Sequence, residues 1–140
     1  MLNVSLRFLC LLFFLFSNLV PVYAAQVFGV KKVISGDTLE LFDGRVIRLI
    51  GLKADSSEAK TFVRSLVEGR GVTLEYDKQK KDKDGHELVY ALMVETFVNA
   101  TILYAGYGVP QSMPPNTKYD AFFQKLYQDA RANKRGLWKK

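Results

Sequence analysis

Residues 35–52 read SGDTLELFDGRVIRLIGL, and this stretch decides which fold the chain is expected to adopt. Apolar and polar side chains alternate over residues 38–42, and an apolar-rich run follows at 45–50. Alternation with a period of two is typical of a β-strand that has one buried face. Between the runs, Asp43 and Gly44 form a strong signal for a two-residue hairpin turn. The stretch therefore predicts a β-hairpin.

The pattern upstream and downstream of this hairpin extends it to a small barrel. Residues 27–34 are apolar-rich and lead into the turn at 35–36, while residues 72–76 and 88–94 have strand composition. A segment with helical periodicity lies between the third and fourth strands, and Gly69 is expected to end this helix. The apolar residues on one face of the helix are Ala59, Phe62, Val63, Leu66 and Val67. Five strands with a helix between the third and fourth, followed by two C-terminal helices, is the order of an α+β protein built on an OB-fold barrel.

Several residues are expected to begin or end these helices. Asp55 and Glu58 have the spacing of a capping pair for the first helix. Asn99 is expected to cap the second, and Thr117 with Asp120 the third. Gly136 is expected to end that third helix. The aromatic residues on one face of this third helix are expected to pack in the core, and Trp138 is expected to pack back onto the helix. The aromatic residues are Tyr119, Phe122, Phe123 and Tyr127.

The first 24 residues have the features of a secretory signal peptide. Arg7 precedes the apolar block FLCLLFFLF at 8–16, and the sequence VYA at 22–24 matches a signal peptidase site. The apolar block is shorter than the roughly 20 residues that span a bilayer, which favours a cleaved signal over an uncleaved anchor. The sequence therefore predicts a signal peptide at 1–24 and one domain at 25–140. The mature protein would be secreted or periplasmic, without stable insertion in the membrane.

Composition narrows the chemistry of the predicted mature domain. The only cysteine, Cys10, lies in the signal segment, so disulfides, cysteine metal sites and a cysteine nucleophile are excluded for residues 25–140. Arg7 is the only ionised side chain lost with that segment, so the formal charge falls from +6 to +5. A basic exported domain favours an anionic partner, although such a charge also occurs in proteins without one.

Five short motifs, taken in order, resemble those of the staphylococcal nuclease-like family. They are SGDT at 35–38, RLIGL at 48–52, DKDGH at 82–86, VN at 98–99 and GLW at 136–138. The resemblance covers almost the whole mature chain. It implies an OB barrel carrying helices, and a calcium-dependent phosphodiesterase that cleaves DNA and RNA.

The resemblance also implies a set of site residues, most of which are substituted here. The family site has two metal-binding aspartates, one glutamate and two arginines. Asp37 matches the first aspartate and Arg48 the first arginine. Lys53 stands at the second aspartate, Ser56 at the glutamate and His86 at the second arginine. Because calcium needs several oxygen ligands, Asp37 is expected to be a vestigial metal ligand and no cofactor is predicted.

The residues at the substituted positions are expected to change the chemistry of the site. The Lys53 ammonium supplies no metal ligand and is expected to take the place of a cation beside Asp37. His86 is mostly neutral at pH 7 and cannot grip a phosphate as a guanidinium does. Asp55 and Glu58 are alternative replacements for the lost carboxylates, although capping explains them more simply.

The charged loop after the fourth strand is the predicted nucleic-acid contact. Its residues Lys80, Lys81 and Lys83, together with Arg48, are expected to bind phosphate groups, although such a run also occurs as a merely solvated loop. The favoured function is an exported nuclease-like module with impaired catalysis that binds nucleic acid or another polyanion. Two alternatives stay open. One is an active calcium-dependent nuclease with a remodelled site; the other is a protein-interaction module. The oligomeric state is not predicted.

Overall fold

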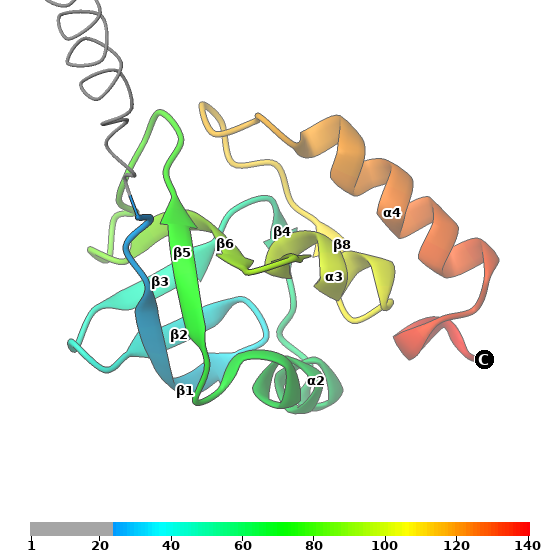
Figure 1. Ribbon diagram of the computed structural model, residues 1–140. Helices are drawn as coiled ribbons and strands as arrows, with labels where there is room; N and C mark the ends of the chain where they lie inside the picture. Colours follow the sequence, from blue (N-terminus) through cyan, green and yellow to red (C-terminus); the bar gives the residue numbers. More distant parts are fainter. Residues whose placement is uncertain (1–23) are drawn as a thin grey trace, which may run out of the picture.

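A computed structural model describes residues 24–140 (Figure 1). The predicted signal peptide lies outside the described residues except for Ala24, so it stays a prediction. Within the described part of the chain, no helix is both long enough and apolar enough to cross a bilayer.

Five strands of residues 24–140 close into the predicted barrel: β1 (Phe28–Ser35), β2 (Thr38–Leu41), β3 (Val46–Leu49), β5 (Gly71–Glu75) and β6 (Glu87–Met93). Neighbouring strands are antiparallel in the order β3-β2-β1-β5-β6. A parallel pairing of β3 with β6 then joins the two ends of the sheet. The OB-type barrel predicted from the sequence is therefore confirmed.

The β2–β3 hairpin follows the alternation read from the sequence. Leu39 and Leu41 of β2, and Ile47 and Leu49 of β3, are fully buried, while their neighbours face outward. The turn is longer than predicted, because the Leu41 N–H donates to the Arg45 carbonyl at 2.9 Å. Three residues, 42–44, therefore form the loop instead of two, with Gly44 at a φ of +90°.

Register shifts in β1 explain how this one strand pairs with both β2 and β5 in the barrel. The β1–β2 pairing shifts between Val30 and Lys32 and again between Val33 and Ser35. Such irregularities bend a strand and increase its twist. The N-terminal part of β1 also pairs with β5, so the bent strand links β2 to β5 in the closed sheet.

The helices pack around this barrel. They are α2 (Ser57–Val67), α3 (Val98–Tyr104), α4 (Asp120–Ala132) and the short 3₁₀ helix η1 (Gly136–Trp138). Figure 1 shows α3 between the barrel and α4, with α2 across the lower end of the barrel in this view. Three short strands not predicted from the sequence complete the described elements: β4 (Leu52–Lys53), β7 (Thr96–Phe97) and β8 (Val109–Pro110).

The predicted helix caps are mostly wrong. The N-cap of α2 is Ser56, whose hydroxyl accepts the Ala59 N–H at 3.0 Å, so Asp55 lies outside the helix and Glu58 in its first turn. The N-cap of α4 is Tyr119, with no side-chain capping bond. Asp120 is the first helical residue there.

The end of α4 also differs from the prediction. The helix stops at Ala132, before Gly136 is reached, and Gly136 instead begins η1. A Cβ added to Gly136 would lie 2.4 Å from the Ala105 carbonyl oxygen. Glycine is therefore required at this position by close backbone approach and a φ of +55°, not by helix termination.

Asn99 is not the predicted cap either, because it lies inside α3 and is fully buried. Its side-chain oxygen accepts the Ala91 N–H at 3.0 Å, and its amide donates to the Ile50 carbonyl at 2.9 Å. The side chain thus joins α3 to β6 and to the residue after β3. Local spacing could not reveal this role, since both partners are distant in the sequence.

The aromatic face of α4 packs as expected, with one exception. Phe123 is fully buried and Tyr119 is partly buried, with the Tyr119 ring centroid 4.6 Å from that of Tyr90. The Tyr127 and Trp138 rings meet at 5.6 Å, which confirms that Trp138 packs back onto α4. Phe122 is exposed, so its assignment to the core is wrong.

Candidate functional site

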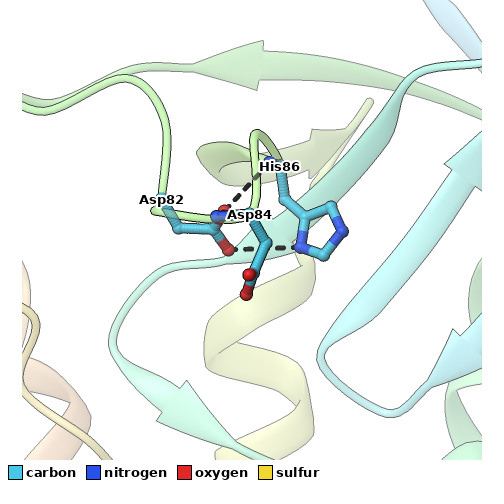
Figure 2. A group of neighbouring side chains, drawn as sticks. All are labelled: Asp82, Asp84 and His86. Atoms are coloured by element: carbon cyan, nitrogen blue, oxygen red, sulfur yellow. Dashed lines mark hydrogen bonds and ion pairs between the residues drawn. The ribbon is translucent and has the colours of Figure 1, made fainter.

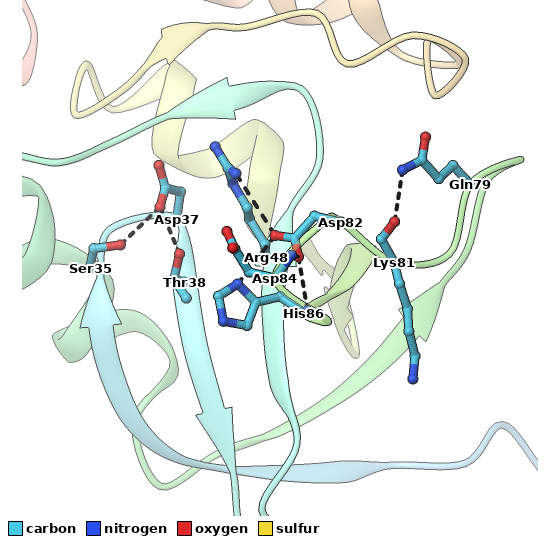
Figure 3. A network of polar contacts seen from close by, with 9 residues as sticks. All are labelled: Ser35, Asp37, Thr38, Arg48, Gln79, Lys81, Asp82, Asp84 and His86. Carbon is cyan, nitrogen blue, oxygen red and sulfur yellow. Dashed lines mark hydrogen bonds and ion pairs between the residues drawn. The ribbon is translucent and has the colours of Figure 1, made fainter.

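Asp37 lies in the turn between β1 and β2, and its carboxylate is engaged on both oxygens. Oδ1 accepts the hydroxyls of Ser35 at 2.8 Å and Thr38 at 2.9 Å (Figure 3). Oδ2 accepts the Ala54 N–H at 3.0 Å. The residue is only 7% exposed. Asp37 therefore joins the β1–β2 turn to the segment that follows β4.

Lys53 does not take a cation's place beside Asp37. Its ammonium forms an ion pair with Asp55 at 3.2 Å, and the Lys53 side chain is 53% exposed. The reason is the pairing of β4 with β8, which matches Leu52 with Pro110 and Lys53 with Val109. Neighbouring strand residues face opposite ways, so burial of Leu52 turns Lys53 outward.

Ser56, which the sequence match places at the family glutamate, is a helix cap in this chain. Ser56 uses its hydroxyl to accept the Ala59 N–H, as α2 begins at the next residue. Glu58 is exposed and accepts the Ser57 hydroxyl at 3.0 Å. Its own backbone N–H and the Ser57 hydroxyl hold the pKa of Glu58 below its ordinary value. Both residues therefore act locally at the helix N-terminus.

Arg48 is brought to the turn after the charged loop by the parallel pairing of β3 and β6, in which it lies opposite Leu88. Its Nη1 is 3.9 Å from Oδ2 of Asp82, and the Arg48 side chain is 34% exposed. Asp37 lies nearby, since its carbonyl accepts the N–H of Leu49 at 2.8 Å. The guanidinium thus forms a long ion pair with one carboxylate and is partly open to solvent.

Asp82 organises the turn that carries His86. Its Oδ1 accepts the backbone N–H groups of Asp84 and His86, both at 2.9 Å, and Oδ2 lies 3.2 Å from Nδ1 of His86 (Figure 2). Burial opposes ionisation of this side chain, but the two backbone N–H groups and the His86 ring outweigh it. The pKa of Asp82 is therefore lower than its ordinary value.

Asp82, Asp84 and His86 together form a possible ligand cluster that sequence reasoning did not assign. Their potential ligand atoms lie within 4.8 Å of one another. The signal for it was present in the DKDGH motif, which places two carboxylates and an imidazole at alternate positions. From the sequence alone, that motif is indistinguishable from an ordinary acidic turn.

The basic loop, residues 78–83, is exposed and only partly joined to this site. Lys80, Lys81 and Lys83 all face solvent, and the Lys80 ammonium lies 5.9 Å from the centroid of the Tyr76 ring. In Figure 3 the Lys81 side chain extends away from the Arg48 guanidinium. The structure therefore brings Asp37, Arg48 and His86 to one end of the barrel, with Lys81 directed elsewhere.

Comparison with known proteins identifies the family to which this barrel and its motifs belong. Residues 51–140 match the family described as staphylococcal nuclease homologue. The chain is 28% identical over 126 residues to a thermonuclease of Staphylococcus intermedius, covering 79% of this chain and 75% of the relative. It is 28% identical over 128 residues to a thermonuclease of Staphylococcus hyicus, covering 81% and 76%. It is 29% identical over 126 residues to the SPbeta prophage-derived endonuclease YokF of Bacillus subtilis (strain 168), covering 78% and 43%. The chain therefore belongs to the staphylococcal nuclease family.

Proposed function

We propose that this protein is a nucleic-acid-binding member of the nuclease family that does not perform calcium-dependent cleavage. The observation that carries the proposal is the engagement of Asp37, whose two carboxylate oxygens already accept three internal hydrogen bonds. A carboxylate used in this way acts as a structural link between two loops. The relatives are named thermonucleases and an endonuclease, which supports nucleic acid as the partner.

The residues around Asp37 do not fit a calcium ion. Calcium takes six to eight oxygen ligands, usually including several carboxylates. Here the second aspartate position is Lys53, paired with Asp55, and the glutamate position is Ser56, which caps α2. An ion at this position would have to compete with the hydrogen bonds of Asp37 while lacking a second carboxylate from either matched position.

Nucleic-acid binding would rest on Arg48 and the basic loop. The Arg48 guanidinium, which is one-third exposed and forms only a long ion pair with Asp82, can donate to phosphate oxygens. Lys80, Lys81 and Lys83 add three exposed ammonium groups. Contacts of this kind recognise the phosphate backbone and carry no sequence preference.

The second candidate is a phosphodiesterase with a remodelled site. The observation that favours it is the His86 ring and the carboxylates of Asp82 and Asp84 beside Arg48. The imidazole would serve as the general acid or base, and Arg48 would stabilise charge on the phosphate. Against this candidate, Asp82 already accepts two backbone N–H groups and contacts the His86 ring.

We also propose that the protein acts outside the cytoplasm, on the basis of the signal-like sequence of residues 1–24. N-terminal sequencing of the protein recovered from the cell envelope and the medium tests this. A sequence starting at Ala25 is expected, and one that retains Met1 would contradict export with cleavage.

A paired assay tests the proposed function. The purified protein is incubated with single-stranded and duplex DNA and with RNA, in calcium and in a chelator, and cleavage is measured. Binding to the same substrates is measured by fluorescence anisotropy over a series of salt concentrations. We expect no calcium-dependent cleavage, with binding that weakens steeply as salt rises.

Each other outcome of the assay identifies a rival. Cleavage that requires calcium and is lost in Asp37→Ala would show that the unmodified protein has the calcium-dependent activity of the family. Cleavage that is kept in Asp37→Ala but lost in His86→Ala would favour the remodelled site. The protein-interaction module is favoured if neither DNA nor RNA binds at low ionic strength.

A further inference from the structure

Asn116 joins two loops through a reciprocal pair of hydrogen bonds. Its Oδ1 accepts the backbone N–H of Gln79 at 2.8 Å, and its Nδ2 donates to the carbonyl of Gln79 at 2.7 Å. The residue is fully buried, although its two neighbours, Pro115 and Thr117, are exposed. Both polar groups of one backbone residue are therefore satisfied by a side chain 37 positions away.

Gln79 lies near the start of the basic loop, so this pair holds the loop where its lysines begin. The rest of the loop is held by bonds to β6 and to the turn that precedes it, including the Asp82 N–H, which donates to the His86 carbonyl at 3.0 Å. The Lys80 carbonyl accepts the Leu88 N–H at 2.9 Å, and the Gln79 side-chain amide donates to the Lys81 carbonyl at 2.8 Å. The loop backbone is therefore fixed between Asn116 on one side and β6 on the other.

The lysine side chains, by contrast, have no carboxylate partner in the described part of the chain. Among residues 24–140, none of Lys80, Lys81 and Lys83 takes part in an ion pair. A fixed backbone that carries closely spaced, unpaired cations is an arrangement that an extended polyanion can use. Holding such groups in place before binding lowers the ordering cost at the moment of binding.

The loop that provides Asn116 is itself well anchored. The Asn116 N–H donates to the Met113 carbonyl at 2.8 Å, closing a turn, and Met113 packs partly on the core. Three residues later, the Tyr119 hydroxyl lies 3.1 and 3.2 Å from the two carboxylate oxygens of Glu75. Asn116 therefore connects the basic loop to a segment that is fixed against the core and against the N-terminus of α4.

We propose that Asn116 is a positioning residue for nucleic-acid binding, which presents the lysines of residues 80–83 to the phosphate backbone. This inference rests on the proposed function, because it takes nucleic acid as the partner. Asn116 itself touches no phosphate in this arrangement. It acts through Gln79, and its effect on binding should therefore depend on the lysines being present.

A double-mutant cycle on the full chain tests this dependence. Four proteins are compared: the unmodified chain, Asn116→Ala, the triple variant Lys80→Ala/Lys81→Ala/Lys83→Ala, and the combination of all four substitutions. The probe is a fluorescent single-stranded oligodeoxynucleotide at low salt. We expect Asn116→Ala to weaken binding about tenfold, in line with the cost of ordering several side chains. In the lysine-free background the same substitution should change binding less than about twofold, because the groups that it positions are gone.

A matched control separates positioning from general destabilisation. Thr101→Val, on α3, removes the hydroxyl that donates to the Phe97 carbonyl at 2.9 Å, and leaves the Asn116–Gln79 pair intact. It should lower the free energy of unfolding without changing affinity for the oligodeoxynucleotide. Trypsin cleavage at residues 78–83 should become faster in Asn116→Ala and stay unchanged in Thr101→Val. Asn116→Ser, whose hydroxyl is too short to serve both Gln79 groups, provides a second variant should Asn116→Ala fail to fold.

The outcomes distinguish this inference from the function on which it rests. If the unmodified chain does not bind at low ionic strength, the proposed function fails and the inference falls with it. If the unmodified chain binds and the Asn116 variants bind equally well, only the inference fails. The inference fails in the same way if the effect of Asn116→Ala is undiminished in the lysine-free background, since the residue would then act elsewhere.

Discussion

Asp37 illustrates how a single residue can look like a metal ligand and serve as a structural link. Its two oxygens accept bonds from Ser35, Thr38 and the N–H of Ala54, and the carboxylate is nearly buried. Removing a buried acceptor leaves its donors unsatisfied, which costs more than the bonds themselves gain.

The first prediction follows from that link. Asp37→Ala should lower the free energy of unfolding by about 2–4 kcal/mol, because the Ala54 N–H loses its acceptor in a buried position. Urea denaturation monitored by circular dichroism measures the change. Asp55→Ala, at an exposed carboxylate, is the control and should cost under about 1 kcal/mol. Unchanged stability in Asp37→Ala would show that the carboxylate is not a structural link.

Arg48 gives a second prediction at this scale. Arg48→Ala should weaken nucleic-acid binding and reduce the slope of log affinity against log salt by about one, because one phosphate contact is lost. Arg48→Lys should keep the slope and recover only part of the affinity, since an ammonium cannot bond a phosphate bidentately. Arg64→Ala, on α2, removes the same charge and should leave both quantities almost unchanged. An unaltered slope in Arg48→Ala would exclude a direct phosphate contact.

At the scale of elements, the turn that precedes β6 depends on one ionised carboxylate. Asp82 accepts N–H bonds from Asp84 and His86, and its pKa is lower in the folded protein than its ordinary value. The stability that it provides is therefore fully present above the unfolded pKa, near about pH 4, and is lost as pH falls through the lower folded pKa.

The third prediction is a pH dependence with that sign. In the unmodified chain, the free energy of unfolding should fall as the pH drops below about 4, and Asp82→Asn should make this part of the profile flatter. Urea titrations across that range measure it. Asp84→Asn is the control, because Asp84 bonds Asp82 through its backbone N–H and not through its side chain. If Asp82→Asn leaves the acid limb unchanged, other carboxylates are responsible for it.

The elements also show which parts of the structure local patterns predict. Alternation in β2 and β3 and the helical period of α2 were enough for the order of the barrel, since burial of one face imposes those periods. The caps at Ser56 and Tyr119 were missed, because several neighbouring polar residues satisfy the same spacing rule. The roles of Asn99 and Asn116 could not be predicted, since their partners lie in other elements.

At the site, the positions of Asp37 and Arg48 followed from motifs. The outward direction of Lys53 could not be predicted in this way, because it depends on the pairing of Lys53 with Val109 in β8.

At the scale of the whole molecule, the proposed function requires that the fold be kept while the cleavage chemistry is lost. On the family match proposed from the sequence, Lys53, Ser56 and His86 stand at three positions where the family carries catalytic groups. If only the side chains are missing, replacing them together should create activity that no single replacement creates.

The fourth prediction is therefore a gain of function. The variant Lys53→Asp/Ser56→Glu/His86→Arg should show slow calcium-dependent cleavage of DNA, while each single variant shows none. We expect low rates, because Ser56→Glu removes the α2 cap, at a cost of about 1 kcal/mol, and position 53 faces outward. Cleavage with calcium and with a chelator measures the gain, and addition of Asp37→Ala is the control that should abolish it. A folded triple variant that binds calcium but cleaves nothing would assign the defect to the short loop before α2.

The parallel closure of the barrel has a consequence for folding kinetics. β3 and β6 are separated in the chain by β4, α2 and β5, so their pairing is non-local and carries a large loop-closure entropy. The contact of Arg48 with Asp82 exists only once that pairing has formed. A chain still in the course of folding therefore presents no finished phosphate-binding face. In stopped-flow experiments, an added oligonucleotide should slow the unfolding limb and leave the refolding limb unchanged, because the ligand stabilises a surface absent from the transition state.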